Sequence, residues 1–79
     1  MKIAEAISKK ILKICKKESI TVNKLAMISG ITQSTLDNIV HNDSKNPKIL
    51  TIVRICDSLN ITLDEFFKDE LFKNIDIEL

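Results

Sequence analysis

The sequence predicts an all-α protein, a compact five-helix bundle in which helices pack directly on one another. At 79 residues the chain has room for one domain. One glycine and one proline leave few places to turn, which favours a few helices over many short strands. Apolar residues also recur three and four positions apart through most of the chain, the spacing of one helical face.

The first helix is expected at residues 3–17. Ile3, Ile7, Ile11 and Ile14 fall on one side of such a helix, and the lysines between them fall largely on the others. The polar residues at 18–19, before Ile20, then break the pattern. We therefore expect one amphipathic helix with a solvated basic surface.

Two short helices follow, each with its own start signal. Thr21 is a good N-cap for a helix at 22–29, and Thr32 for one at 33–40. Gly30 stands between them, where a helix end favours a residue that tolerates positive φ. Two short helices joined by a tight turn form a helix-turn-helix. The expected inward-facing residues are Leu25, Ala26 and Ile28 from the first of the two helices and Leu36 and Ile39 from the second.

A polar stretch at 41–46 separates this motif from a fourth helix. Asn42 is suited to a left-handed cap, and Pro47 to the first turn of the next helix. Asn60 is expected to end the fourth helix. Its apolar face is expected to hold Ile49, Ile52, Val53, Cys56 and Leu59.

Thr62 predicts the cap of a fifth helix, with Asp64 and Glu65 in its first turn. The sequence thus predicts a helical domain at 1–67 and an acidic C-terminal tail at 68–79 that could serve dimerisation or a partner. The alternation at 75–79 fits a short strand, a helix extension or a frayed end equally well.

Charge is divided unevenly along the chain. Residues 1–63 hold ten Lys and Arg against five Asp and Glu, whereas residues 64–79 hold two against six. The formal net charge of +1 therefore conceals a basic body and an acidic tail. A basic body is compatible with a surface that faces phosphates.

The residues offer little for catalysis. Cys15 and Cys56 stand far apart and are expected to be buried free thiols, and His41 is the only histidine. No phosphate-binding glycine loop or metal-ligand spacing is present, so we expect no enzyme activity, no metal and no cofactor. No apolar run approaches membrane-spanning length and no signal peptide is evident, which predicts a cytoplasmic protein.

Two blocks of sequence resemble the phage-repressor/Cro (XRE) family of helix-turn-helix domains, which have the lambda repressor-like fold. The first block is Ile20-Thr21-x-x-x-Leu25-Ala26-x-x-x-Gly30-Ile31-Thr32-Gln33-Ser34-Thr35-Leu36. The second is Lys45-Asn46-Pro47 followed by Ile55-Cys56-Asp57-Ser58-Leu59-Asn60-Ile61-Thr62-Leu63-Asp64-Glu65-Phe66-Phe67. The resemblance covers about residues 7–67, and both blocks occur in register.

The resemblance implies roles for the exposed residues around the motif. Base reading in the major groove would fall to the exposed start and outer face of the second helix of the motif, where Gln and Asn can bond adenine in a bidentate manner. Phosphate contacts would fall to the start of the motif's first helix and to the loop after the second. The implied base-reading residues are Thr32, Gln33, Ser34, Asp37 and Asn38, and the phosphate-contacting residues are Thr21, Asn23, His41, Lys45 and Lys48.

Three departures from the family pattern weaken or alter these roles. Val22 stands where relatives commonly have a phosphate-contacting Gln, and Asp37 adds a negative charge near the groove. Relatives often bury an Arg–Glu pair at the positions of Cys15 and Val40. Because both partners are replaced by apolar residues here, no uncompensated buried charge is expected.

The resemblance thus implies a sequence-specific DNA-binding transcriptional regulator, expected to be a repressor that binds a palindromic operator on double-stranded DNA as a homodimer. Phe66 is expected in the core, and no small-molecule substrate is evident. The alternative is a protein-interaction module that keeps the fold without binding DNA, which the near-zero net charge, Val22 and Asp37 favour. The expected dimer surface is Phe67, Leu71, Phe72 and Ile75.

Overall fold

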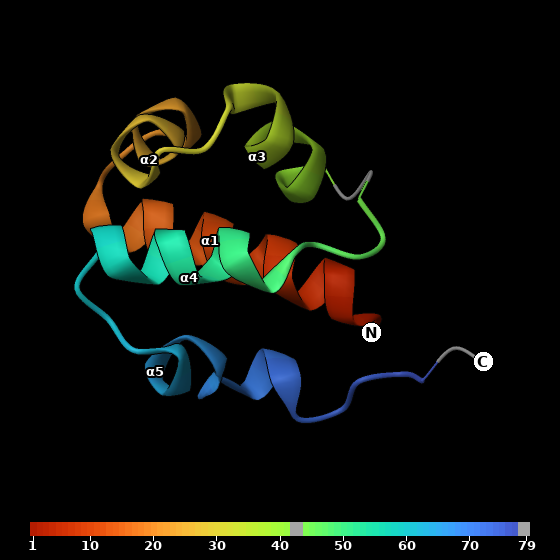
Figure 1. Cartoon of the computed structure of the whole chain (residues 1–79). Coiled ribbons are helices and arrows are strands. Elements are labelled where there is room, and N and C mark those ends of the chain that lie inside the picture. The colour runs from red at the N-terminus through yellow and green to blue at the C-terminus, as the bar shows by residue number, and fades with distance from the viewer. Residues whose placement is uncertain (42–43, 78–79) are drawn as a thin grey trace.

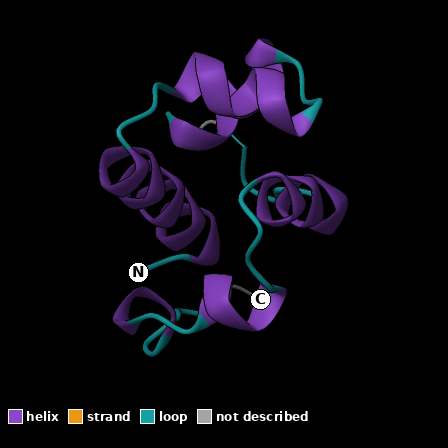
Figure 2. Ribbon diagram, turned by 90° about the vertical axis from the view of Figure 1, so that its left-hand side faces the viewer, coloured by secondary structure: helices purple, strands orange, loops and turns teal. Residues whose placement is uncertain are grey.

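The computed structural model describes residues 1–41 and 44–77, and within them it contains five α-helices and one short 3-10 helix. The α-helices are α1 (Ile3–Glu18), α2 (Val22–Ser29), α3 (Gln33–Val40), α4 (Ile49–Ser58) and α5 (Leu63–Phe67), and the 3-10 helix is η1 (Glu70–Phe72). Helices α2 and α3 form one end of the molecule, α1 and α4 the middle, and α5 with η1 the other end (Figure 1 and Figure 2). The predicted all-helical fold is confirmed. None of the helices in the described ranges is long and apolar enough to cross a membrane.

One apolar core joins the three layers. Every α-helix contributes to it, and Phe66 of α5 is fully buried, as predicted. Burying a side chain of this size contributes about 1.5–3 kcal/mol, so these residues dominate the stability of so small a domain. The largest fully buried side chains are Phe66, Ile11, Leu25, Leu36, Ile52 and Ile55.

The helix starts lie where the threonines predict them. The hydroxyl of each of these threonine N-caps accepts a hydrogen bond from a backbone amide three residues later, which satisfies one of the donors left free at a helix start. These bonds are Lys24 to Thr21 at 3.0 Å, Thr35 to Thr32 at 3.2 Å and Glu65 to Thr62 at 3.0 Å. Gly30 ends α2 with φ +67°, in the left-handed region that favours glycine.

Several predicted details are wrong. Four residues expected on inward apolar faces are instead exposed: Ile3 at 39%, Ile28 at 43%, Ile49 at 60% and Val53 at 38%. On α2 the inner position after Ala26 is taken by Ser29, which is buried and bonds a hydroxyl of α4. Pro47 lies before the N-cap residue Lys48 and so outside the first turn of α4. Asn42 lies outside the described residues, and so do positions 78–79 of the expected alternation.

The acidic tail folds back against α1. Its described part forms η1 and then an extended segment that adopts neither a strand nor a continued helix. Phe72 packs against Phe66 and Phe67, with ring centroids 6.1 and 4.9 Å away. Backbone and ionic contacts join Met1 to Asp76, since the Asp76 amide bonds the Met1 carbonyl at 3.0 Å and the terminal amine lies 3.0 Å from the Asp76 carboxylate.

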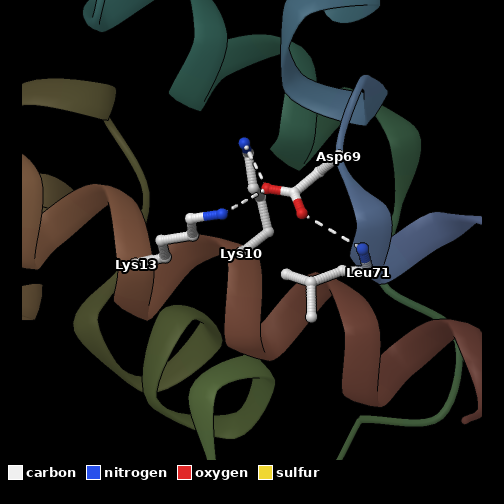
Figure 3. Close-up of polar contacts among 4 residues, drawn as sticks. All are labelled: Lys10, Lys13, Asp69 and Leu71. Atoms are coloured by element: carbon white, nitrogen blue, oxygen red, sulfur yellow. Dashed lines mark hydrogen bonds and ion pairs between the residues drawn. The ribbon is translucent and has the colours of Figure 1, made fainter.

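Asp69 fastens this tail to α1 (Figure 3). One of its carboxylate oxygens accepts hydrogen bonds from Lys13 at 2.9 Å and Lys10 at 3.0 Å, and the other accepts from the Leu71 amide at 3.1 Å. The side chain of Asp69 is only 7% exposed. The bonds from Lys13, the Leu71 amide and Lys10 hold the pKa of the Asp69 carboxyl well below its usual range.

Candidate nucleic-acid interface

Helix α3 lies at one end of the molecule (Figure 1), and its outer face is polar. Leu36 and Ile39 point into the core with 0% and 3% exposure, which fixes the opposite side of the helix toward solvent. Of the predicted base-reading residues on α3, Gln33, Ser34 and Asn38 are exposed and Asp37 is half-buried. The side chains of Ser34 and Asn38 are one turn apart and share the outermost strip of the helix.

Thr32, the remaining predicted base reader, makes two hydrogen bonds through its hydroxyl at the start of α3. Its hydroxyl accepts from the Thr35 amide at 3.2 Å and donates to the Thr35 hydroxyl at 2.8 Å. Because that proton is already used, the Thr32 side chain can offer a base its methyl group or a remaining oxygen lone pair but no O–H donor. The bond from the Thr35 amide also holds the first turn of α3 in place.

His41 is positioned by the helix that it terminates. Its Nδ1 lies 2.8 Å from the carbonyl oxygen of Asp37. A carbonyl oxygen can only accept, so Nδ1 carries the proton, and Nε2 is left to face solvent. In the neutral ring Nε2 is an acceptor, and only the protonated ring can donate from it to a phosphate oxygen.

The predicted phosphate contacts lie on two segments in the chain on either side of α3. Thr21 and Asn23 are exposed at the start of α2, and Lys45 and Lys48 are exposed in the segment that leads to α4. Thr21 accepts from the Lys24 amide, which leaves its hydroxyl proton free to donate. Val22, beside it, packs against the core and offers no polar group.

The ion pairs show which basic residues of the sequence are paired with a carboxylate and which are not. Lys10 and Lys13 of α1 are paired with Asp69, the N-cap residue of η1. The end of the molecule formed by α5 and η1 lies opposite the end formed by α2 and α3 (Figure 1). Within residues 1–41 and 44–77, no ion pair involves Lys24, Lys45, Lys48 or Arg54, all of which lie in or between α2 and α4. The tail therefore pairs two lysines of α1, whereas the cations in and between α2 and α4 take part in none of the ion pairs of the described residues.

A surface groove runs along one flank of α3. Its volume is about 430 Å³, and it lies between α3 on one side and the start of α4 with its preceding loop on the other. Asn38 belongs both to this groove and to the outer strip of α3. Arg54 also lines it, a residue that the sequence reasoning missed, although it is the only arginine of the chain.

The Cys15 and Val40 positions are both apolar parts of the interior. Cys15 is 6% exposed, and Val40 packs against the same core cluster. The Val40 carbonyl accepts a bond of 2.7 Å from the hydroxyl of Ser8 on α1, so a polar link still ties α1 to the end of α3. Burial raises the pKa of the Cys15 and Cys56 thiols, which are both free.

The predicted dimer residues are partly used within the chain. Phe67, Leu71, Phe72 and Ile75 are all half-buried. Phe67 and Phe72 pack edge to face against each other, with ring centroids 4.9 Å apart, and both contact the core cluster. Only the outer parts of these side chains are therefore available to a second copy.

Comparison with known proteins shows the family of the domain. A family model for the Cro/C1-type HTH DNA-binding domain matches residues 10–71 of the chain. The chain is also similar to a solved structure, the crystal structure of the prophage Lp1 protein 11, with a TM-score of 0.82 and 29% identity. That similarity covers 95% of this chain and 100% of the other. No curated protein matches the sequence.

Proposed function

The chain belongs to the Cro/C1-type helix-turn-helix DNA-binding domains, and from this premise we propose that it is a transcriptional repressor whose helix α3 reads the major groove. The observation that carries the proposal is the outer face of α3. Gln33, Ser34 and Asn38 are exposed together there, while Leu36 and Ile39 anchor the helix in the core. Gln and Asn pair with adenine N6 and N7, and Ser can bond several bases.

The residues around α3 would contact the phosphates of the DNA backbone. Thr21 and Asn23 would meet phosphates on one side of the groove, with the exposed amides at the start of α2 beside them. His41, Lys45 and Lys48 would meet them on the other. Phosphate contacts fix the register of the helix, whereas contacts with base edges select the sequence.

A homodimer on a palindromic operator completes the proposal. One helix of eight residues contacts few base pairs, and two copies that read half-sites one helical turn apart, roughly 34 Å, give useful specificity. The outer surfaces of Phe67, Leu71, Phe72 and Ile75 remain the proposed contact between copies. The molar mass in solution at rising protein concentration, with and without operator DNA, tests this part.

Titration into duplex DNA at several salt concentrations tests the function itself. A DNA-binding protein releases counterions, so its affinity must fall linearly with salt on a logarithmic scale. No binding even at low salt would instead favour a protein-interaction module, for which Val22 and Asp37 are the supporting residues.

A further inference from the structure

Arg54 connects α4 to the turn of the helix-turn-helix. Its guanidinium Nη1 donates to the Gly30 carbonyl over 3.3 Å. One turn further along α4, Ser58 donates to the Ile55 carbonyl, so its oxygen accepts the 2.8 Å bond from the buried Ser29 hydroxyl. These two bonds hold the end of α2 and the turn that starts α3.

The guanidinium has more donors than this contact uses. An arginine side chain carries five N–H groups, and the bond to Gly30 engages one. Arg54 is exposed, and no carboxylate among residues 1–41 and 44–77 forms an ion pair with it. Its charge and remaining donors are therefore available at the groove beside α3.

The lining of that groove is suited to an anion. Lys48 and Arg54 supply positive charge, and Thr35 and Thr51 supply hydroxyl groups. The acidic residue of α3, Asp37, is absent from the lining. Among planar donors, the arginine fork fits the geometry of phosphate oxygens especially well.

The position of the groove indicates which phosphate it would receive. A helix with its side chains is about 10–12 Å across and the major groove is about 12 Å wide, so a helix inside it has a phosphate backbone along each flank. In the proposed complex the start of α2 meets one backbone, and the groove with Arg54, which lies on the flank of α3 that faces α4, would meet the other.

We propose that the groove between α3 and α4 is a binding site for a DNA backbone phosphodiester, in which Arg54 both contacts the phosphate and positions the turn through the Gly30 carbonyl. This proposal rests on the proposed function. Arg54 thereby links the contact with the DNA phosphate to the orientation of α3. It is a positioning residue as well as a phosphate ligand, and it carries no sequence information of its own.

The test uses the whole chain and a mixed-sequence duplex of about two helical turns, roughly 20 base pairs, titrated at several salt concentrations. Arg54→Gln removes the charge and keeps an amide donor, and Arg54→Lys keeps the charge and loses the fork. Lys17→Gln is the matched control, because Lys17 is an exposed cation of α1 outside the groove lining.

Arg54→Gln should lower the slope of log affinity against log salt by about 0.9, the contribution of one phosphate contact. Arg54→Lys should retain the slope of the unchanged protein and lose roughly fivefold in affinity, the equivalent of one hydrogen bond. Lys17→Gln should retain both the slope and the affinity of the unchanged protein. An unchanged slope in Arg54→Gln overturns the phosphate site, and so does an equal drop in Lys17→Gln. Absence of binding by the unchanged protein would overturn the proposed function first, so the two failures are distinguishable.

Discussion

Replacement of Asp69 by Asn should destabilise the fold by about 2–3 kcal/mol. Asp69 is 7% exposed and Lys10 is 14% exposed, so their bond is largely shielded from water. A hydrogen bond to a charged group is worth about 1.5–3 kcal/mol in such a setting. Lys13 is 63% exposed, and solvent screening limits its share to about 1 kcal/mol or less. The amide oxygen of Asn can still accept from the Leu71 amide, so that bond adds little to the loss.

The difference in stability between the unchanged protein and Asp69→Asn should also depend on pH. The pKa of the Asp69 carboxyl is lowered in the folded state, so its contribution is fully present above the unfolded-state pKa of about 3.9 and is lost as pH falls through the folded value. The gap between the unchanged protein and Asp69→Asn should therefore be constant from about pH 5 to 8 and should narrow in stronger acid.

Urea unfolding followed by circular dichroism at several pH values measures both effects. In thermal unfolding, for a chain of this length, the expected loss of stability in Asp69→Asn corresponds to a fall in Tm of roughly 10–20 °C. Asp57→Asn is the control, since Asp57 is exposed on α4, and its cost should stay within about 0.5 kcal/mol. A loss for Asp69→Asn no larger than that of the control would show that the Asp69 contacts do not stabilise the fold, and so would a stability gap that does not narrow below pH 4.

The remaining predictions concern the helix-turn-helix. Gly30→Ala should cost about 1–2 kcal/mol in urea unfolding, because φ is +67° and an added Cβ meets no atom within 4 Å, leaving backbone strain as the main penalty. No loss at all would contradict the left-handed turn. Gln33→Ala should weaken operator binding by about 1–3 kcal/mol and relax the preference at one base pair. An equal loss on every duplex would make Gln33 a phosphate contact. Lys45→Ala should weaken binding to all duplexes alike and reduce the slope of log affinity against log salt by about one. A loss of affinity confined to the operator would argue against a phosphate contact at Lys45.

Local signals predicted the helix-turn-helix closely. Thr21 and Thr32 cap α2 and α3 at the expected residues, and Gly30 adopts the expected positive φ. Each of these signals acts over three or four residues, within the range that a sequence pattern records. The exposed polar face of α3 follows from the same periodicity, because burial of Leu36 and Ile39 determines it.

The tail and the groove depend on contacts between distant parts of the chain. Asp69 bonds Lys10 and Lys13 across 59 and 56 residues, and no periodicity near residue 69 encodes that pairing. The bond from Arg54 to Gly30 spans 24 residues and likewise has no local signal. Ile28 is exposed for a related reason, since the neighbouring Ser29 is buried with a hydroxyl partner that α4 supplies from 29 residues away.

Selection of bound sequences from a random pool of duplex DNA tests the central claim most directly, that α3 reads the major groove of an operator. If α3 reads an operator, selection should enrich two inverted half-sites whose centres lie about one helical turn apart, roughly 10 base pairs. Gln33→Ala should alter the base preference at one position in each half-site, while Lys45→Ala should leave the selected sequence unchanged. A pool that remains random after selection with the folded protein would contradict the account.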